Sequence, residues 1–197
     1  DGHNLLMFSY VPNCQSYDPV YAYELAVIVR HGIERMFEQG HDEFYYITMM
    51  NENYHHPKMP EGVEADIVKG LYCFQSDPQP ASAHVELIGG GAIFNEVLNA
   101  AGILKRHGIS SNIWSATSFN QLRRDIESVN RERLYHPEVK RKSHVEQCFE
   151  NCSHPIIAAT DYIKQYAQQV SDHMPKHYHC LGTDGFGRSD TRENMRK

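Results

Sequence analysis

Apolar residues follow two spacings along the chain, one typical of helices and one typical of short strands. A helix is expected between Asp18 and Gly40, because apolar residues return every three or four positions from Ala22 to Phe37 and charged residues lie between them. Asp18 is expected to cap this helix, Pro19 to occupy its first turn and Gly40 to end it. A strand at 44–49 should follow. The apolar stripe of the helix is expected to contain Ala22, Leu25, Ala26, Val29, Ile33, Met36 and Phe37.

From residue 85 onward, predicted strands and helices alternate regularly. The strands are expected at 85–88, 112–116, 155–159 and 178–181, and the helices at 93–107, after Ser118, at 145–151 and at 162–173. Strands separated by helices indicate right-handed crossovers and a mostly parallel, Rossmann-like α/β sheet with helices on both faces. The buried stripe of helix 93–107 should be Phe94, Val97, Leu98, Ala101 and Leu104.

Residues 76–83 have the proline- and serine-rich composition of an exposed linker. A short helix at 61–70 and a strand at 71–74 are expected before it. The sequence therefore predicts two domains, residues 1–75 and residues 84–197, joined by this linker.

Composition excludes some classes of function. A net charge of −6 argues against a broad nucleic-acid surface. No window has the roughly 18 uninterrupted apolar residues of a membrane span. Five scattered cysteines form no disulfide framework, which indicates the reducing cytoplasm. Cys148, Cys152 and His154 fit no common zinc spacing and are interpreted as ordinary side chains.

The candidate chemistry follows the strand at 44–49. Asn51, Glu52, Asn53, Tyr54, His55 and His56 crowd its exit before Pro57. Ligands of open α/β sheets bind beyond the carboxyl ends of the strands, so this cluster could offer an acid or a base to a substrate. The alternative is a polar loop that only caps a strand.

Two glycine-rich segments also follow strands. Gly89–Gly91 lacks the third glycine of a dinucleotide-binding loop, because Phe94 stands at that position, and no acidic residue ends the next strand. A Rossmann-like sheet without a nucleotide is therefore expected. Gly182–Asp190 could bind an anionic group or order a subunit contact, or it could form a tight turn that caps another helix.

Five stretches together resemble the homodimeric bacterial type of pyruvate dehydrogenase, the thiamin-diphosphate-dependent subunit of the pyruvate dehydrogenase complex. They are Val11–Glu24, Asn51–His55, Met59–Gly62, Thr160–Tyr162 and Gly182–Asp190. The resemblance implies that residues 1–75 are the end of the middle, pyrimidine-binding domain. It implies that residues 84–197 are a truncated transketolase C-terminal-like domain.

The activity that the resemblance implies is oxidative decarboxylation of pyruvate and acetyl transfer to a lipoyl group on the acyltransferase core. Thiamin diphosphate and Mg²⁺ would serve the full-length homodimer. The Gly-Asp-Gly magnesium–diphosphate motif is absent, and the cofactor-activating glutamate is expected upstream, so this segment alone should bind neither and be inactive. No nucleic acid or membrane is an expected partner.

The same resemblance implies the candidate catalytic residues. His55 is expected near the substrate, Glu52 is expected to orient it or contact the substrate, and Tyr17 is a third candidate. An imidazole can donate or accept a proton near neutral pH. The tandem His55-His56 leaves open which histidine is functional. The alternative function is a non-catalytic interaction or scaffold domain that retains only the C-terminal fold.

Overall fold

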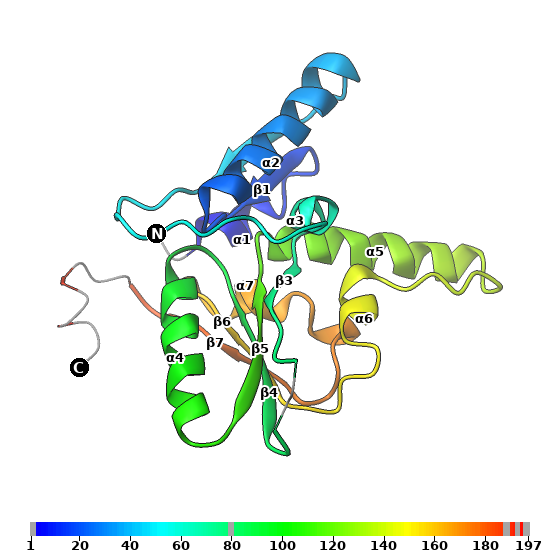
Figure 1. The fold of residues 1–197 in the computed structure, drawn as a ribbon. Coiled ribbons are helices and arrows are strands. Elements are labelled where there is room, and N and C mark those ends of the chain that lie inside the picture. Colours follow the sequence, from blue (N-terminus) through cyan, green and yellow to red (C-terminus); the bar gives the residue numbers. More distant parts are fainter. Residues whose placement is uncertain (1–2, 79–80, 187–189, 192–193, 195–197) are drawn as a thin grey trace.

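The computed structural model describes residues 3–78, 81–186, 190–191 and 194, and these form two sheets with their helices (Figure 1). The elements, in chain order, are α1 (Asn4–Phe8), β1 (Cys14–Tyr17), α2 (Ala22–Ile33), the π-helical turn η1 (Glu34–Glu38), β2 (Phe44–Ile47), α3 (Glu64–Lys69), β3 (Tyr72–Gln75), β4 (His84–Gly89), the 3₁₀ turn η2 (Gly91–Ile93), α4 (Phe94–Arg106), β5 (Ser110–Ser115), α5 (Phe119–Tyr135), α6 (His144–Cys148), β6 (Ile156–Ala159), α7 (Gln165–Gln168), the 3₁₀ turn η3 (Ser171–His173) and β7 (Tyr178–Leu181).

The larger sheet has five strands in the order β3-β5-β4-β6-β7. β4 runs parallel to β5 and β6, and β6 runs parallel to β7, while β3 is antiparallel to β5 at one edge. The predicted mostly parallel α/β sheet is therefore confirmed. β3 precedes the expected linker at 76–83 and yet pairs with this sheet, and the division into two domains stays a prediction.

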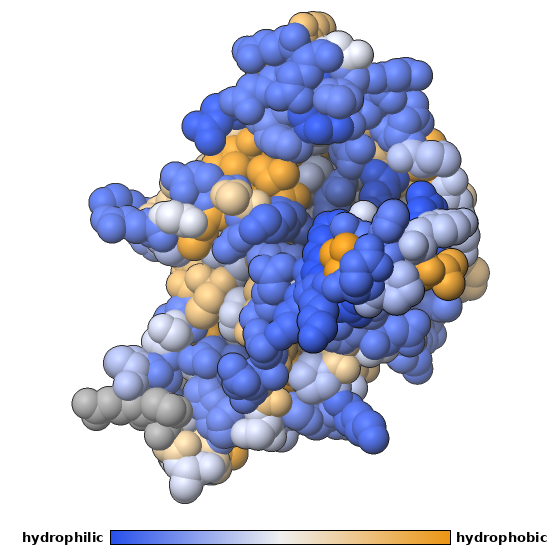
Figure 2. Space-filling view, turned by 90° about the vertical axis from the view of Figure 1, so that its right-hand side faces the viewer, coloured by the Kyte–Doolittle hydropathy of each residue, from blue (hydrophilic) through white to orange (hydrophobic). Residues whose placement is uncertain are grey.

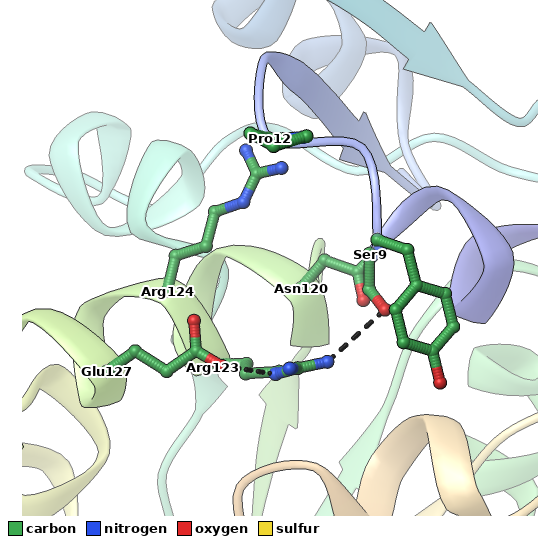
Figure 3. Close-up of a pocket in the computed structure, with 7 residues that line it drawn as sticks. Ser9, Pro12, Asn120, Arg123, Arg124 and Glu127 are labelled. Carbon is green, nitrogen blue, oxygen red and sulfur yellow. Dashed lines mark hydrogen bonds and ion pairs between the residues drawn. The ribbon is translucent and has the colours of Figure 1, made fainter.

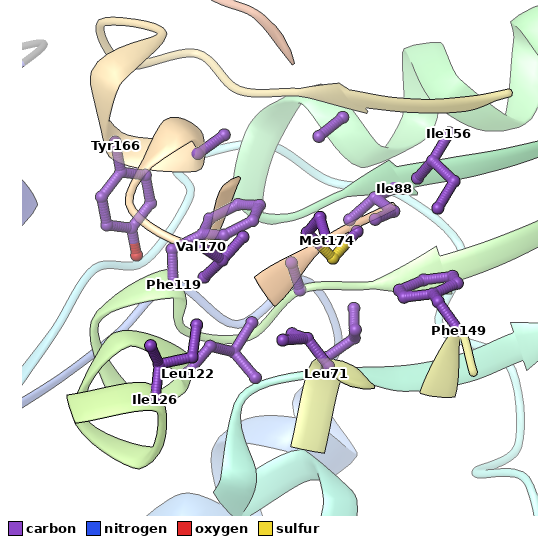
Figure 4. Packing of buried hydrophobic residues seen from close by; sticks show 14 of the residues in the cluster. Leu71, Ile88, Phe119, Leu122, Ile126, Phe149, Ile156, Tyr166, Val170 and Met174 are labelled. Carbon is purple, nitrogen blue, oxygen red and sulfur yellow. The ribbon is translucent and has the colours of Figure 1, made fainter. Parts of the chain in front are cut away.

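Helices cover both faces of the larger sheet. α4 packs on one face, where Phe94 and Val97 contact Val85 and Leu87, while Leu98 and Leu104 are partly buried beside them. α5, α6 and α7 pack on the other face, whose core is shown in Figure 4. The stripe predicted for α4 is thus confirmed. The second core contains Leu5, Leu71, Ile88, Ala116, Phe119, Leu122, Ile126, Val145, Phe149, Ile156, Ala158, Tyr166, Ala167, Val170 and Met174.

The smaller unit consists of β1, β2, α2 and α3, and α2 rises above the larger sheet in Figure 1. β1 and β2 form a two-stranded parallel sheet. Tyr17, Val27, Ile28, Ile67 and Tyr72 form its core. The predicted stripe of α2 was wrong, because Val29, Ile33 and Phe37 of that stripe are 43%, 48% and 78% exposed.

Helix boundaries differ from the prediction most clearly at α2 and at the helix predicted for 162–173. α2 begins at Ala22, and Asp18 is not its cap, because the chain stays non-helical from Asp18 to Tyr21. Glu24 and His56 accept the free N–H groups of the helix start instead. The predicted helix 162–173 is divided into α7 and η3. Ser118 does cap α5, as expected, and its hydroxyl accepts from the backbone N–H of Gln121 at 3.0 Å.

The face that carries the far end of α5 is mostly hydrophilic, with apolar side chains in several separate places (Figure 2). Most exposed large apolar residues of the smaller unit lie on α2, η1 and β2 and in the residues just after β2. They are Val29, Ile33, Phe37, Phe44 and Met49. Within the described part of the chain, no helix has the length and hydrophobicity needed to cross a membrane.

Candidate functional site

Residues 48–56, which follow β2 and are here named the 48–56 segment, lie along residues 17–22 and are fastened to them at intervals. Thr48 donates its backbone N–H to Tyr17 O at 3.0 Å and its hydroxyl to Asp18 Oδ1 at 2.5 Å. Tyr54 donates its hydroxyl to Val20 O. The 48–56 segment lacks secondary structure of its own, and its position is fixed by this row of hydrogen bonds.

The two adjacent histidines have different surroundings. The His56 Nδ1 atom accepts from the backbone N–H of Ala22, the first residue of α2, at 3.0 Å. The His56 ring stacks on Tyr54, with 4.7 Å between centroids, and meets the edge of Tyr21 at 5.9 Å. His55 is exposed and forms no hydrogen bond or ring contact with the described residues. The structure therefore gives His56 an architectural position and leaves the His55 ring accessible.

The other two candidate residues lie in opposite environments. Glu52 is exposed on the 48–56 segment, three residues before His55. Tyr17 is 2% exposed and packs in the core beside Ile67 and Tyr72. Its hydroxyl donates to Val68 O at 2.9 Å, and burial raises the pKa of this phenol well above its usual range. The structure brings Glu52 and His55 to one exposed segment and places Tyr17 in the core instead.

Beneath the 48–56 segment lies a buried glutamate that the sequence analysis did not single out. Glu24 accepts hydrogen bonds from the hydroxyls of Tyr72 at 2.6 Å and Ser115 at 2.7 Å, and from the backbone N–H groups of Val20 and Tyr21. Burial raises the pKa of Glu24, although these four donors act in the opposite direction. Because the donors come from α2's own start, β3 and β5, Glu24 joins the smaller unit to the larger sheet.

A second buried carboxylate, Asp18, lies where the strands of both sheets end. Its side chain accepts from Thr48 and, at 3.4 Å, from the hydroxyl of Tyr162. Burial raises the pKa of Asp18 to about 6, and the nearby Asp161 carboxylate adds to the effect. The sequence signal for this residue was present in the Tyr-Asp-Pro turn after β1, but it was interpreted as a helix cap.

The Gly89–Gly91 segment is packed tightly against this carboxylate. A Cβ atom on Gly91 would lie 2.2 Å from Asp18 Oδ2, and one on Gly90 would lie 2.2 Å from Ala116 O. The glycines therefore allow backbone segments to approach each other closely. A phosphate bound at this turn would meet the Asp18 carboxylate, which supports the expectation of a sheet without a nucleotide.

Other parts of the chain were also candidates for ligand binding. Within the described residues, no group of three or more His, Cys, Asp or Glu side chains could hold a metal ion. Asp184, in the Gly182–Asp190 stretch, pairs with Lys164 at 2.7 Å, and Asp190 accepts from the backbone N–H of Thr191. Gly187, Arg188 and Ser189 of that stretch lie outside the described residues.

A pocket of about 270 Å³ opens between α5 and the chain that links α1 to β1 (Figure 3). Its polar groups already have partners, since Arg123 bridges Glu127 and Ser9 while Arg124 binds Gln15 and Val11 O. None of the three candidate catalytic residues lines this pocket. Its lining is Ser9, Tyr10, Pro12, Asn120, Arg123, Arg124 and Glu127.

The comparison with protein families separates the chain into two matched regions. Residues 70–197 match the transketolase-like TK C-terminal domain. The chain belongs to this family. Residues 1–57 match the pyruvate dehydrogenase E1 component middle domain. The transketolase C-terminal-like fold predicted for the second half is thereby confirmed.

Curated relatives match this chain along its whole length. The pyruvate dehydrogenase E1 components of Pseudomonas aeruginosa, Cupriavidus necator and Escherichia coli are 51%, 48% and 46% identical to it. Each alignment covers 100% of this chain and 22% or 23% of the relative. The chain thus spans less than a quarter of these subunits, and the resemblance inferred from its motifs is confirmed.

Solved transketolases share the fold at much lower sequence identity. The transketolase of Campylobacter jejuni has a TM-score of 0.62 and 14% identity, and the match covers 98% of this chain and 25% of that one. A split-gene transketolase described as an inactive beta4 tetramer has a TM-score of 0.55 and 14% identity, with 98% and 54% covered. These structures support the fold alone.

Proposed function

We propose that the longer protein represented by this chain is a pyruvate dehydrogenase E1 subunit. It would decarboxylate pyruvate oxidatively and transfer the acetyl unit to a lipoyl group on an acyltransferase core, as a cytoplasmic homodimer. The supporting observation is the 46–51% identity to E1 components over the entire chain. The exposed, fastened 48–56 segment is the part that this chain would contribute to the active site.

Thiamin diphosphate and Mg²⁺ would be held by residues outside this chain. The described residues offer no metal-binding group, and Asp18 occupies the glycine turn that would otherwise face a phosphate. Bound thiamin diphosphate would supply the electron sink for loss of carbon dioxide. The role of the present residues is therefore limited to orientation and proton transfer.

His55 is proposed as the residue that moves a proton to or from an oxygen of the substrate. Its ring is exposed, while both neighbours are held: Tyr54 by Val20 and His56 by Ala22. An accessible imidazole on a fixed backbone meets the geometric demand of general acid–base catalysis. Glu52 would orient His55 or contact the substrate side, and Tyr17, whose hydroxyl is occupied by Val68, would support the site from the core.

The test is His55→Gln in the full-length subunit, assayed with pyruvate, thiamin diphosphate, Mg²⁺ and lipoyl acyltransferase. Loss of a positioned acid or base should reduce turnover by about 10²-fold or more. The matched control is His41→Gln, because His41 is another exposed histidine of the smaller unit and is remote in sequence from the 48–56 segment. The control should keep full turnover.

His56→Ala distinguishes the two neighbouring histidines. It removes the ring nitrogen that accepts the Ala22 N–H, so it should lower the unfolding temperature, whereas His55→Ala should leave that temperature unchanged. Full turnover in His55→Gln would remove His55 from the mechanism. A folded full-length subunit that does not decarboxylate pyruvate would favour the non-catalytic scaffold instead.

A further inference from the structure

Asp18 is the point at which the ends of five strands meet. It directly follows β1, and its backbone N–H donates to Thr117 O, beyond β5, at 2.8 Å. Its backbone oxygen accepts from the N–H of Gly91, beyond β4, at 3.1 Å. Its carboxylate accepts from Thr48, beyond β2, and from Tyr162, beyond β6. One residue therefore contacts the carboxyl edges of both sheets.

The side chain of Asp18 has little freedom to move. Only 7% of the residue is exposed, and the Gly91 backbone is so close that no Cβ atom would fit there. The hydroxyl of Tyr166, which lies in the core near Tyr162, is buried without a hydrogen-bond partner among the described residues. The Asp18 carboxylate is thus enclosed by the glycine turn and by the hydroxyls of Thr48 and Tyr162, and a shift of the carboxylate would have to move the strand ends.

Asp18 also holds the beginning of the 48–56 segment. The segment is fastened at Thr48 by the Asp18 carboxylate, at Tyr54 by Val20 and at His56 by Ala22. The last two contacts lie within the smaller unit, whereas the first also reaches the larger sheet through Tyr162 and Gly91. Asp18 therefore connects the position of His55 to the larger sheet.

We infer that Asp18 is a positioning residue: its carboxylate sets the 48–56 segment, and with it His55, in register with the carboxyl edge of the five-stranded sheet. This inference rests on the proposed function for its catalytic consequence. Its structural consequence, an ordered 48–56 segment, can be measured without any activity.

The experiment uses the full-length subunit with Asp18→Ala, Asp18→Asn and Thr48→Val. Asp18→Ala removes the acceptor of both hydroxyls, so amide hydrogen exchange should accelerate about tenfold or more at Thr48 and Ala22, whose N–H groups bind the two ends of the 48–56 segment to residues 17–22. Acetyl transfer should fall about tenfold or more through kcat, because displacement of a catalytic group by about 1 Å is costly. Asp18→Asn retains an oxygen acceptor and should restore both quantities to within about threefold of wild type.

Thr48→Val tests the same link from the other side and remains informative if Asp18→Ala does not fold. It should also accelerate exchange of the Ala22 amide, which binds the far end of the 48–56 segment. The matched control is Glu43→Gln, which alters another carboxylate of the smaller unit, one paired with Arg35 at 2.6 Å. This control should leave the exchange of the Thr48 and Ala22 amides and kcat at wild-type values.

Unchanged exchange of the Ala22 amide in both Asp18→Ala and Thr48→Val would overturn the inference, whatever happens to turnover. Equal loss of turnover in Asp18→Ala and Glu43→Gln would also overturn it, because a general loss of stability would then explain the effect. A wild-type subunit without pyruvate dehydrogenase activity would defeat the proposed function, yet the exchange measurement would still decide the role of Asp18.

Discussion

The smaller unit and the five-stranded sheet are stabilised in different ways. The larger sheet is covered on both faces by helices and buries most of its apolar side chains. The smaller unit has two strands and keeps several large apolar residues exposed, so its own core is limited. It is joined to the larger sheet by directional polar contacts, such as Ser118 Oγ to Ser16 O and Thr117 Oγ1 to Ile67 O, both at 2.6 Å.

The difference shows that two kinds of interaction have separate effects in this chain: burial of apolar side chains stabilises the larger sheet, and hydrogen bonds fix the position of the smaller unit. Apolar burial is non-directional and stabilises the larger sheet without fixing what lies at its edge. Buried hydrogen bonds are directional, and each is costly to leave unmade. The candidate catalytic residues His55 and Glu52 belong to the smaller unit. Their position relative to the larger sheet therefore depends on the hydrogen bonds between the two, here named the polar seam, which include those of Asp18, Glu24, Thr117 and Ser118.

The largest expected effect comes from breaking the seam at Glu24. Glu24→Ala would leave the hydroxyls of Tyr72 and Ser115 and two backbone N–H groups without an acceptor. We expect the free energy of unfolding to fall by about 3–5 kcal/mol, measured by urea denaturation of the 197-residue chain. Glu24→Gln, which keeps one oxygen acceptor, should lose distinctly less. A loss below about 1 kcal/mol in Glu24→Ala would show that the seam contributes little.

A steric change at the edge of the larger sheet should have an intermediate effect. Gly90→Ala places a Cβ atom 2.2 Å from Ala116 O, so the free energy of unfolding should fall by about 2–3 kcal/mol. The matched control is Gly102→Ala in α4, where no atom lies within 4 Å of the new Cβ. That variant should be more stable by about 0.5–1 kcal/mol, because alanine favours the helix. Equal effects in both variants would contradict the close-packing argument.

The smallest expected effect is a pH dependence that arises from Asp18. Its folded-state pKa of about 6 is above the ordinary value of 3.8, so its contribution to stability is present at low pH and lost as the pH rises through 6. Between pH 5 and pH 7, wild type should lose about 1 kcal/mol relative to Asp18→Asn. Chemical denaturation at both pH values measures this difference.

Glu43, also in the smaller unit, is expected to change the stability with pH in the opposite direction to Asp18. The hydrogen bond from Arg35 holds the pKa of Glu43 below its usual range. Its contribution is therefore present at neutral pH and lost as the pH falls through the lowered pKa.

A wild-type chain whose stability relative to Asp18→Asn does not change between pH 5 and pH 7 would contradict the assignment for Asp18.

The sequence predicted the larger sheet well, because its strands and helices alternate and their apolar spacing reports burial directly. Ser118 and the stripe of α4 are examples, since both depend on local chemistry. The face of α2 was predicted wrongly, because the helix has apolar residues on more than one side. Spacing alone could not decide whether Val27 and Ile28 or Val29 and Ile33 would be buried, since the choice depends on the tertiary position of Tyr45 and Ile67.

The candidate site was only partly accessible to sequence analysis. The polar segment after β2 was singled out because ligands gather beyond strand ends, and Glu52 and His55 are exposed on it. Asp18 and Glu24 were missed as network centres, because their donors, such as Thr48, Tyr162 and Ser115, are remote in sequence. Local patterns indicate caps and stripes, but they do not report which distant hydroxyl will meet a buried carboxylate.

The tandem histidines have different surroundings because alternate residues of the segment face opposite ways. Tyr54 and His56 stack together against the smaller unit, and the residue between them is left facing outward. Two chemically identical rings on adjacent residues thus have different roles, since His56 is fixed by hydrogen bonding and stacking while His55 is accessible. A chain with a single histidine in this segment could serve only one of these roles. A histidine directly after Tyr54 would be accessible, and one two residues after Tyr54 would stack on it.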